Sequence, residues 1–431
     1  MRRFDFSEPG FEAAFAAFIE ERRETPEEVD TAVRDVLAAV RQEGVGALLR
    51  FGKQFDRVDL TEADLRVSAE EIEAGAAACS AEVREAIAFA AARIRTYHER
   101  QRPADQWFVD EAGVELGWRW TALEAVGIYV PGGRAAYPST VLMNAVPAAA
   151  AGVERIAMVT PPGKLQPAVL AAAKAAGVTE IWRVGGAQAV AALAYGAGPI
   201  KPVDKIVGPG NAFVTAAKRR VYGTVGIDAL AGPSEIVVVA DGANDPDWIA
   251  ADLLSQAEHD PAAQSILITD DAGFAGRVAE CVEGQLKTLA TGVDAAASWR
   301  DHGGIILAPL DEAPRLVDLI APEHVEFAME NPERLSDRVR HAGAIFLGRL
   351  TPEAIGDYVA GSNHVLPTSR AARFSSGLSL YDFIKRTSIV KCDEASFGIL
   401  GPHTVALAEA EGLPAHARSA AIRLGNRAKP S

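Results

Sequence analysis

The sequence predicts an α/β fold with two doubly wound, incomplete Rossmann-like domains, a helical N-terminal region and a small C-terminal segment. Its 431 residues exceed the roughly 250–300 residues at which single cores stop growing, so two or more domains are expected. Short apolar segments alternate with helical segments between about residues 124 and 228, and a second series of the same kind follows. Such alternation is typical of parallel strands joined by helices.

The region from Pro26 to about Arg102 is predicted to be helical. Apolar residues recur at spacings of three and four in the segment TPEEVDTAVRDVLAAVRQEG. Thr25, followed three residues later by Glu28, predicts a capping box at the start of the first helix. The motif GVGALL at Gly44 lies inside this helical region, and no GxGxxG motif follows a predicted strand, so the usual dinucleotide fingerprint is absent from the sequence.

The two alternating series supply the predicted strands and helices. The first series contains AVGIYV, STVLMNAVPAAAAG, RIAMVT, QPAVLAAAKAAG, EIWRV and KIVG. The second contains SEIVVVAD, DPDWIAADLLSQAE, QSILITDD, FAGRVAECVEGQLKTL, GGIILAP and GAIFLG. Because open parallel sheets bind ligands outside the carboxyl ends of their strands, we expect the functional cleft at those ends.

The chain after about Tyr381 contains a helical stretch and a polar tail that are too short to form a core, so we expect this segment to dock on another surface, such as a second subunit. The predicted division is an N-terminal arm (1–25), a first α/β domain (26–125 with 231–380), a second α/β domain (126–230) and a C-terminal segment (381–431).

Composition excludes several classes of partner. The formal charge of −15, with no local Lys/Arg stripe, disfavours binding to nucleic acid or to an anionic membrane. The N-terminus lacks the apolar core of a signal peptide, and no window approaches ~18 uncharged apolar residues, so we expect a cytoplasmic protein. The three cysteines, Cys79, Cys281 and Cys392, are odd in number and far apart, which favours packing roles over disulfides, a metal site or a nucleophile.

Three glycine-rich turns follow predicted strands in the first series. They are VPGGRAAYPST at Val130, VGGAQAV at Val184 and VGPGN at Val207. Each turn could bring backbone N–H groups to a phosphate at a helix N-terminus, although any one of them could also be a tight turn without a ligand. Because all three lie in one series, they would face the same sheet edge, which favours a nucleotide site.

The segment DLLSQAEHD contains the first candidate metal ligands. Gln256 and His259 are three residues apart on a predicted amphipathic helix, which places both side chains on one face. This spacing suits two ligands of one metal ion. The alternative is that His259 is a capping or surface residue of the helix.

Further acid and histidine pairs occur in predicted loops. Their types suit acid–base or metal chemistry, and helix-cap or turn roles remain the alternative. These residues are Glu323 and His324, Asp357 and His364, and Glu411 and His416. A mixed set of His, carboxylate and amide groups suits zinc, with manganese as an alternative. The residues by themselves thus indicate a metal-assisted α/β enzyme and leave hydride transfer and hydrolysis both open.

Nine segments in collinear order closely resemble histidinol dehydrogenase, from roughly residue 25 to the C-terminus. They are IYVPGGRAAYPSTVLMN, VGGAQAVAALAYG, KIVGPGNAFVTAAKR, DALAGPSEI, DLLSQAEHD, APEHVE, GDYVAGSNHVLPT, FSSGLSLYDFIKRTS and EGLPAHA.

The resemblance implies a role for each matching residue. One zinc ion per subunit would be ligated by Gln256, His259, Asp357 and His416, residues that also surround the substrate. Glu323 and His324 would transfer protons, and Ser234, His364 and Glu411 would contact the substrate as well. NAD would bind at Tyr129, Gln188 and Asn211, in the second α/β domain, whereas the first domain would carry most of the zinc and proton-transfer residues.

The implied activity is the NAD-dependent four-electron oxidation of L-histidinol to L-histidine through L-histidinal, the last step of histidine biosynthesis. The family forms homodimers in which the partner's C-terminal segment, here with Glu411 and His416, completes the active site. Three rival hypotheses are a related dehydrogenase acting on another small polyol or sulfonated diol, a zinc hydrolase that needs no NAD, and a non-catalytic metal-binding or assembly protein.

Overall fold

The computed structural model describes residues 1–20, 27–132, 137–163, 165–230 and 232–425. The chain divides into two compact units. Met1–Gln101 and Leu123–Phe383 form the first unit, and Arg102–Ala122 and Ile384–Ser431 form the second. The predicted capping box at Thr25 lies outside the described residues.

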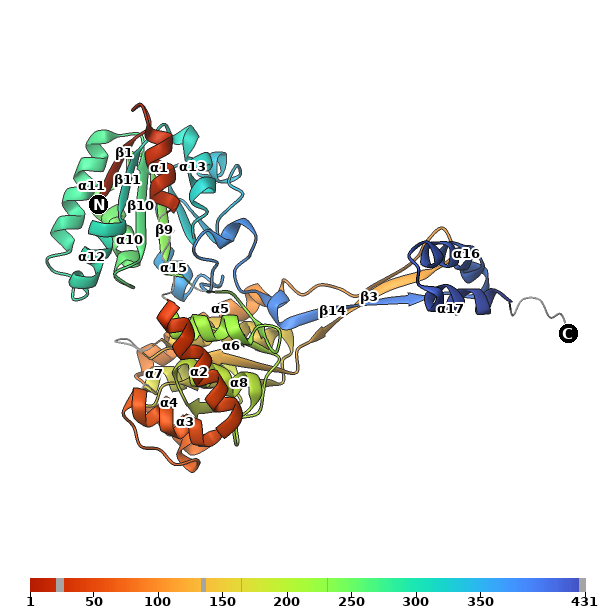
Figure 1. Ribbon diagram of the computed structural model, residues 1–431. Helices are drawn as coiled ribbons and strands as arrows, with labels where there is room; N and C mark the ends of the chain where they lie inside the picture. Colours follow the sequence, from red (N-terminus) through yellow and green to blue (C-terminus); the bar gives the residue numbers. More distant parts are fainter. Residues whose placement is uncertain (21–26, 133–136, 164, 231, 426–431) are drawn as a thin grey trace. The chain divides into compact units, whose positions relative to one another are not determined.

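A six-stranded parallel sheet in the first unit has the order β1-β11-β10-β9-β12-β13 (Figure 1). Its strands are β1 (Arg2–Asp5), β9 (Glu235–Ala240), β10 (Gln264–Thr269), β11 (Gly304–Leu307), β12 (His324–Ala328) and β13 (Ala344–Leu347). Its helices are α1 (Phe11–Glu20), α10 (Pro246–Ala257), α11 (Ala272–Gln285), α12 (Gly292–His302), α13 (Ala313–Ile320), α14 (Glu333–Ser336) and α15 (Glu353–Tyr358).

Both faces of this sheet are covered, and every residue of the central strands β9, β10 and β12 is buried. Alternate residues of β9 point to opposite faces: Ile236 and Val238 join a core with α10, α11 and α12, whereas Val237 and Val239 join a core with α1 and α13. Residues 1–20, which we predicted as part of an arm, contain both β1, paired with β11, and α1, whose phenylalanines pack on the second of these cores.

A second parallel sheet, with five strands, has the order β6-β5-β4-β7-β8. Its strands are β4 (Ala125–Tyr129), β5 (Arg155–Thr160), β6 (Glu180–Arg183), β7 (Lys205–Val207) and β8 (Gly226–Ile227). Its helices are α6 (Pro138–Ala151), α7 (Pro167–Ala176), α8 (Gly186–Tyr195) and α9 (Ala212–Val221).

The N-terminal helices pack on the helices of the five-stranded sheet. They are α2 (Glu27–Glu43), α3 (Val45–Phe51), α4 (Ala69–Ala78) and α5 (Ala81–Glu99). Helix α2 contacts α8 and α9, α4 contacts α7, and α5 contacts α6. This arrangement differs from the predicted division, in which residues 26–125 accompany the other sheet.

Both sheets share one strand order. Numbered by their own sequence order, the strands of the five-stranded sheet run 3-2-1-4-5, and so do β9 to β13 of the six-stranded sheet. The strand order therefore reverses between β4 and β7 and between β9 and β12, and these are the points where ligands bind in doubly wound folds. The prediction of two incomplete Rossmann-like halves is confirmed.

The second unit is built from two separate stretches of the chain. Strand β3 (Glu115–Ala122) pairs antiparallel with β2 (Gln106–Val109) and, along eight residues, with β14 (Ile384–Lys391). Helices α16 (Glu394–Ala410) and α17 (Pro414–Gly425) follow. The sequence analysis anticipated the C-terminal part of this unit but not its partner segment at 102–122.

Short turns of 3₁₀ or π type complete the described elements: η1 (Gly52–Asp56), η2 (Ala63–Leu65), η3 (Leu310–Glu312), η4 (Ala371–Arg373) and η5 (Leu380–Phe383). Among the helices that the structure describes, none is both long and apolar enough to cross a membrane.

A substitution at Gly208, in the turn after β7, tests how closely the backbone of this turn approaches β4. Gly208 has a φ of 107°, and a Cβ at this position would lie 2.3 Å from the carbonyl oxygen of Tyr129. We expect Gly208→Ala to lower the free energy of unfolding by more than about 2 kcal/mol, since conformational strain and a backbone clash add. Gly223→Ala is the control, because its φ is 99° with no atom within 4 Å. Equal losses for the two variants in urea denaturation would contradict the close approach.

Candidate active site

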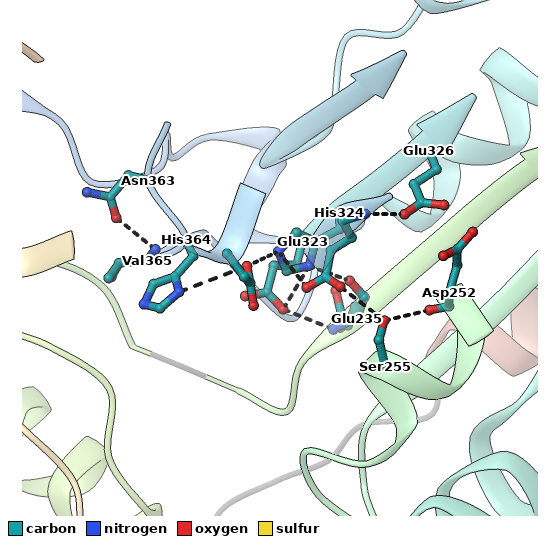
Figure 2. Close-up of polar contacts among 11 residues, drawn as sticks. Glu235, Asp252, Ser255, Glu323, His324, Glu326, Asn363, His364 and Val365 are labelled. Carbon is teal, nitrogen blue, oxygen red and sulfur yellow. Dashed lines mark hydrogen bonds and ion pairs between the residues drawn. The ribbon is translucent and has the colours of Figure 1, made fainter. Parts of the chain in front are cut away.

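Glu323 and His324 lie at the amino edge of the six-stranded sheet. His324 is the first residue of β12, and Glu235 is the first residue of the neighbouring strand β9 (Figure 2). The expectation that the site of this sheet lies at the carboxyl ends of its strands is therefore wrong for this cluster. The cause is local: the acid–histidine pair precedes the apolar residues of HVEFA, so it starts a strand instead of following one.

The backbone of Glu235 orients both side chains. The His324 Nδ1 atom lies 3.1 Å from the Glu235 carbonyl oxygen, and the Glu235 N–H donates to Glu323 Oε2 at 3.0 Å. With Nδ1–H donating to that carbonyl, Nε2 is the nitrogen left for chemistry. His324 Nε2 has no hydrogen-bond partner among the described residues, although it is buried.

Helix α15 supplies two carboxylates opposite this nitrogen. Glu353 and Asp357 are four residues apart on α15, and this spacing places them on one helix face. His324 Nε2 lies 3.8 Å from Glu353 Oε1 and 3.7 Å from Asp357 Oδ1. One ligand atom from each of these three residues lies within 4.8 Å of the others, which is a spacing that a metal ion could bridge.

His364 contacts this group, and Gln256 follows Ser255, whose hydroxyl contacts Glu353. Gln256, in the last turn of α10, is completely buried, and neither atom of its amide has a hydrogen-bond partner among the described residues. His364 Nδ1 is 3.9 Å from Asp357 Oδ1. An unpartnered buried amide costs about 1–3 kcal/mol, which a ligand atom at the site would offset.

The remaining predicted metal ligands occupy exposed positions. His259 is exposed just after α10, and its charge acts on both Asp357 and His364. His416 lies on α17 and Glu411 caps the end of α16; both are exposed residues of the second unit. Ser234 directly precedes Glu235, and its carbonyl oxygen accepts from the Gln264 N–H at 2.9 Å.

Burial and charge strongly perturb the titration of the cluster. Burial raises the pKa of Glu323 to about 8 against the opposing charge of His324. Burial acts to lower the pKa of His324, but the carboxylates of Glu323, Asp357 and Glu353 outweigh it and raise this pKa to about 10. For Asp357, burial is likewise outweighed, by His324, His364 and His259, and its pKa falls to about 2. The His324 value differs from the near-neutral pKa expected of an isolated imidazole.

Two further acidic residues, Glu326 and Asp252, lie to one side of the cluster (Figure 2). The Glu353 N–H donates to Glu326 Oε1, and Ser255 Oγ contacts Glu353 Oε2 at 3.1 Å. Burial, then the charge of Asp252, holds the pKa of Glu326 well above its usual range, and burial raises the pKa of Asp252 to about 6. The sequence analysis missed Glu353, although its four-residue spacing from Asp357 was a usable signal.

The second group of predicted residues lies at the carboxyl edge of the five-stranded sheet. Tyr129 ends β4, at the point where the strand order reverses, and its hydroxyl accepts from the Gly186 N–H at 3.0 Å. Gln188 is buried two residues further on in α8. Asn211 begins α9, and its Oδ1 accepts from the N–H groups of residues 213 and 214 at 3.1 and 3.2 Å.

Two of the three glycine turns meet at Tyr129. Gly186 belongs to VGGAQAV, and Gly208 of VGPGN approaches the Tyr129 carbonyl closely. The Gly208 N–H donates to Asp228 Oδ2 at 2.8 Å, its carbonyl accepts from Lys218 Nζ at 2.9 Å, and Lys218 and Asp228 form a buried ion pair. Part of the third turn, residues 133–136, lies outside the described residues.

Comparison with known proteins identifies the family to which this arrangement belongs. The family model for histidinol dehydrogenase matches residues 19–424, nearly the whole chain. The chain belongs to the histidinol dehydrogenase family. The resemblance found in the nine sequence segments is thus confirmed, and it extends beyond those segments.

Relatives in the histidinol dehydrogenase family match along almost their entire length. Histidinol dehydrogenase from Caulobacter vibrioides is 80% identical over 98% of this chain and 99% of its own. The enzyme from Mesorhizobium japonicum is 61% identical over 97% of this chain and 98% of its own. The crystal structure of histidinol dehydrogenase from Elizabethkingia anophelis superposes with a TM-score of 0.94 at 37% identity, covering 100% of this chain and 99% of that one.

Membership of the histidinol dehydrogenase family makes the chain an oxidoreductase and fits a dehydrogenase role in histidine biosynthesis. Among the described residues, the group of His324, Glu353 and Asp357 is a possible metal site within this enzyme. Glu353 was not among the ligands that we predicted from the sequence.

Proposed function

We propose that the chain oxidises L-histidinol to L-histidine through L-histidinal, in two NAD-dependent steps at a site that holds one zinc ion. The observation that carries this proposal is the convergence of Glu323, His324 and Asp357 at one sheet edge. Gln256, whose buried amide has no partner among the described residues, follows Ser255, which contacts Glu353 of the same group. Proton-transfer groups and ligand atoms for a cation thereby occupy one place.

Gln256, His259, Asp357 and His416 of the partner subunit would hold the zinc ion. When bound, zinc would orient the substrate by its amine and imidazole nitrogens. Two carboxyl groups, those of Glu353 and Asp357, lie within 4 Å of His324 Nε2, so the site offers oxygen atoms that suit a cation. A positive charge beside Asp357 would also offset the carboxylates that raise the pKa of His324.

Tyr129, Gln188 and Asn211 would form the NAD site. NAD, when bound, accepts hydride in each oxidation. All three residues lie at the carboxyl edge of the five-stranded sheet, where the strand order reverses and where α8 and α9 begin after glycine turns. Helix N-termini present unpaired N–H groups that suit the pyrophosphate of a dinucleotide.

His324 would take the proton from the substrate hydroxyl through Nε2, because its Nδ1 is engaged by the Glu235 carbonyl. Glu323 would activate the water that adds to the aldehyde, and His324 would then remove a proton from the hydrate. The pKa of about 8 for Glu323 suits a carboxyl group that exchanges protons near neutral pH.

Direct hydration of the aldehyde is preferred over a covalent thiohemiacetal. The three cysteines occupy other parts of the chain: Cys79 follows α4, Cys281 lies in α11, and Cys392 follows β14. None of them belongs to the group around His324 that the structure describes.

The proposal includes a homodimer in which the partner's second unit completes the site. Apolar side chains of the second unit are unusually exposed, among them Trp107, Val109, Val390, Leu407 and Ile422, each with more than half of its surface accessible. Exposed apolar groups of this extent favour burial against another chain. His416 and Glu411 lie on the same unit.

The stoichiometry of NADH tests the reaction. With excess NAD and zinc-loaded protein, we expect about two NADH per L-histidinol consumed, lost after chelation and restored by zinc, because alcohol and aldehyde are each oxidised once. The measurement is NADH absorbance against histidinol and histidine quantified by chromatography. A ratio of about one would contradict the second oxidation, and absence of NADH would favour a hydrolytic enzyme instead.

Replacement of His324 tests its role as a base. We expect His324→Ala to lower kcat by about 10²–10⁴-fold with the zinc content unchanged, since general base catalysis is worth about this factor. His302→Ala, which removes a partly buried histidine of α12, is the control and should keep kcat. Zinc content is measured by elemental analysis; loss of zinc from the His324 variant would make this residue a ligand and refute the assignment.

Mixed dimers test the shared site. Asp357→Ala and His416→Ala chains should each be inactive alone, because each lacks one zinc ligand. After mixing and subunit exchange we expect about a quarter of wild-type activity, since half of random dimers are heterodimers with one intact site out of two. Activity is assayed after mass spectrometry has verified heterodimers. If verified heterodimers have no activity, the two residues do not come from different subunits.

A further inference from the structure

A cavity of about 500 Å³ on the first unit is lined mainly by arginine side chains. The lining consists of five arginines, one histidine, one aspartate and two apolar residues: Arg315, Arg338, Arg340, Arg370, Arg373, His341, Asp318, Pro314 and Leu319. We call it the arginine cavity. Such a concentration of positive charge is notable in a chain whose formal net charge is −15.

Acidic neighbours compensate the positive charge of two of these arginines. Arg315 pairs with Glu12 at 2.8 Å and with Glu312 at 2.9 Å. Arg338 lies 3.8 Å from Asp311. These two side chains contribute little uncompensated charge.

The other three arginines lack an acidic partner among the described residues. The one carboxylate of the cavity, Asp318, uses its Oδ1 to accept the backbone N–H groups of Arg340 and His341, at 2.8 and 2.9 Å. Arg370 Nε is buried and has no hydrogen-bond partner in the described structure. A guanidinium nitrogen that has lost water without gaining an acceptor is costly. Arg340, Arg370 and Arg373 all line the cavity, and an anion there would supply the counter-charge that these three side chains lack.

The backbone that carries Arg370 is strained and held in place. Ser369 and Arg370 have φ values of 54° and 63°, a conformation that costs residues other than glycine roughly 1–2 kcal/mol each. The Ser369 N–H donates to Glu235 Oε1 at 3.1 Å, and Thr368 Oγ1 accepts from the Gly232 N–H at 2.6 Å. Strain of this kind clusters at ligand-binding positions. Here the two hydrogen bonds hold the strained backbone in place, and Arg370 lines the cavity.

We propose that the arginine cavity binds a phosphomonoester, a small organic molecule that carries one phosphate group. Guanidinium groups match the geometry and charge of phosphate through paired N–H donors. The cavity volume suits a small molecule and exceeds what phosphate alone would fill, and Pro314 and Leu319 offer an apolar wall to the organic part. This site is separate from the proposed NAD site, which lies at the other sheet, and it goes beyond the proposed function.

Calorimetric titration of the full-length protein with three probes tests the proposal. Phenyl phosphate should bind with saturation, inorganic phosphate should bind more weakly, and phenol should not bind measurably, because the phosphate group supplies the recognition. Excess NAD should leave the binding of phenyl phosphate unchanged. Absence of saturable binding of phenyl phosphate, equal binding of phenol, or displacement by NAD would each overturn the assignment.

Paired variants locate the binding site. The double variant Arg340→Gln/Arg373→Gln should bind phenyl phosphate at least about tenfold more weakly for each arginine replaced, because the loss of one charged hydrogen bond lowers an affinity by about this factor. Arg34→Gln with Arg84→Gln removes the same charge from exposed helix positions and should change affinity by less than about twofold. Circular dichroism melting establishes that both variants are folded. Equal affinities of the two double variants for phenyl phosphate would overturn the proposal. So would a cavity variant whose homodimer is weakened while its binding of phenyl phosphate is unchanged.

Discussion

The pairing of β9 with β12 is the interaction on which the candidate active site depends. It places the Glu235 backbone next to the start of β12. There the Glu235 N–H donates to the Glu323 side chain, and the Glu235 carbonyl contacts the His324 ring. Because both strands are buried on both faces, slippage of one residue would turn the apolar side chains of β12 toward the wrong cores. The register that fills the cores therefore also fixes Glu323 and His324, the two proposed proton-transfer groups.

Charge balance is the second constraint on this site. Glu323, Glu326 and Glu353 are buried, and Asp357 is nearly so; the buried imidazole of His324 lies beside them as a group that can carry a positive charge. Buried carboxylates are costly unless protons or cations neutralise them. Burial raises the pKa values of Glu323, Glu326 and Glu353, which favours their protonated, neutral forms at the amino edge of the sheet. Protonation thereby lowers the free-energy cost of burying these carboxyl groups when no cation is bound.

The two sheets use the same strand order in different ways. In the five-stranded sheet, Tyr129 and the glycine turns lie at the carboxyl edge, as the rule for doubly wound folds predicts. In the six-stranded sheet, the acid and histidine cluster lies at the amino edge, and Asp357 of α15 belongs to it. The position of the first group agrees with the general rule, and the position of the second does not, because His324 starts its strand instead of following it.

The sequence by itself determined the α/β class, most of the buried strands and the residue types of both candidate sites, because apolar periodicity and glycine placement are local properties. It did not determine which surfaces meet. Only the tertiary structure decided that α2 to α5 pack on the five-stranded sheet, that β1 extends the six-stranded sheet, and that residues 102–122 pair with β14. The physical reason is that an apolar face requires burial without specifying its partner. Glu353 likewise joined the candidate site only through packing that brought α15 against β12.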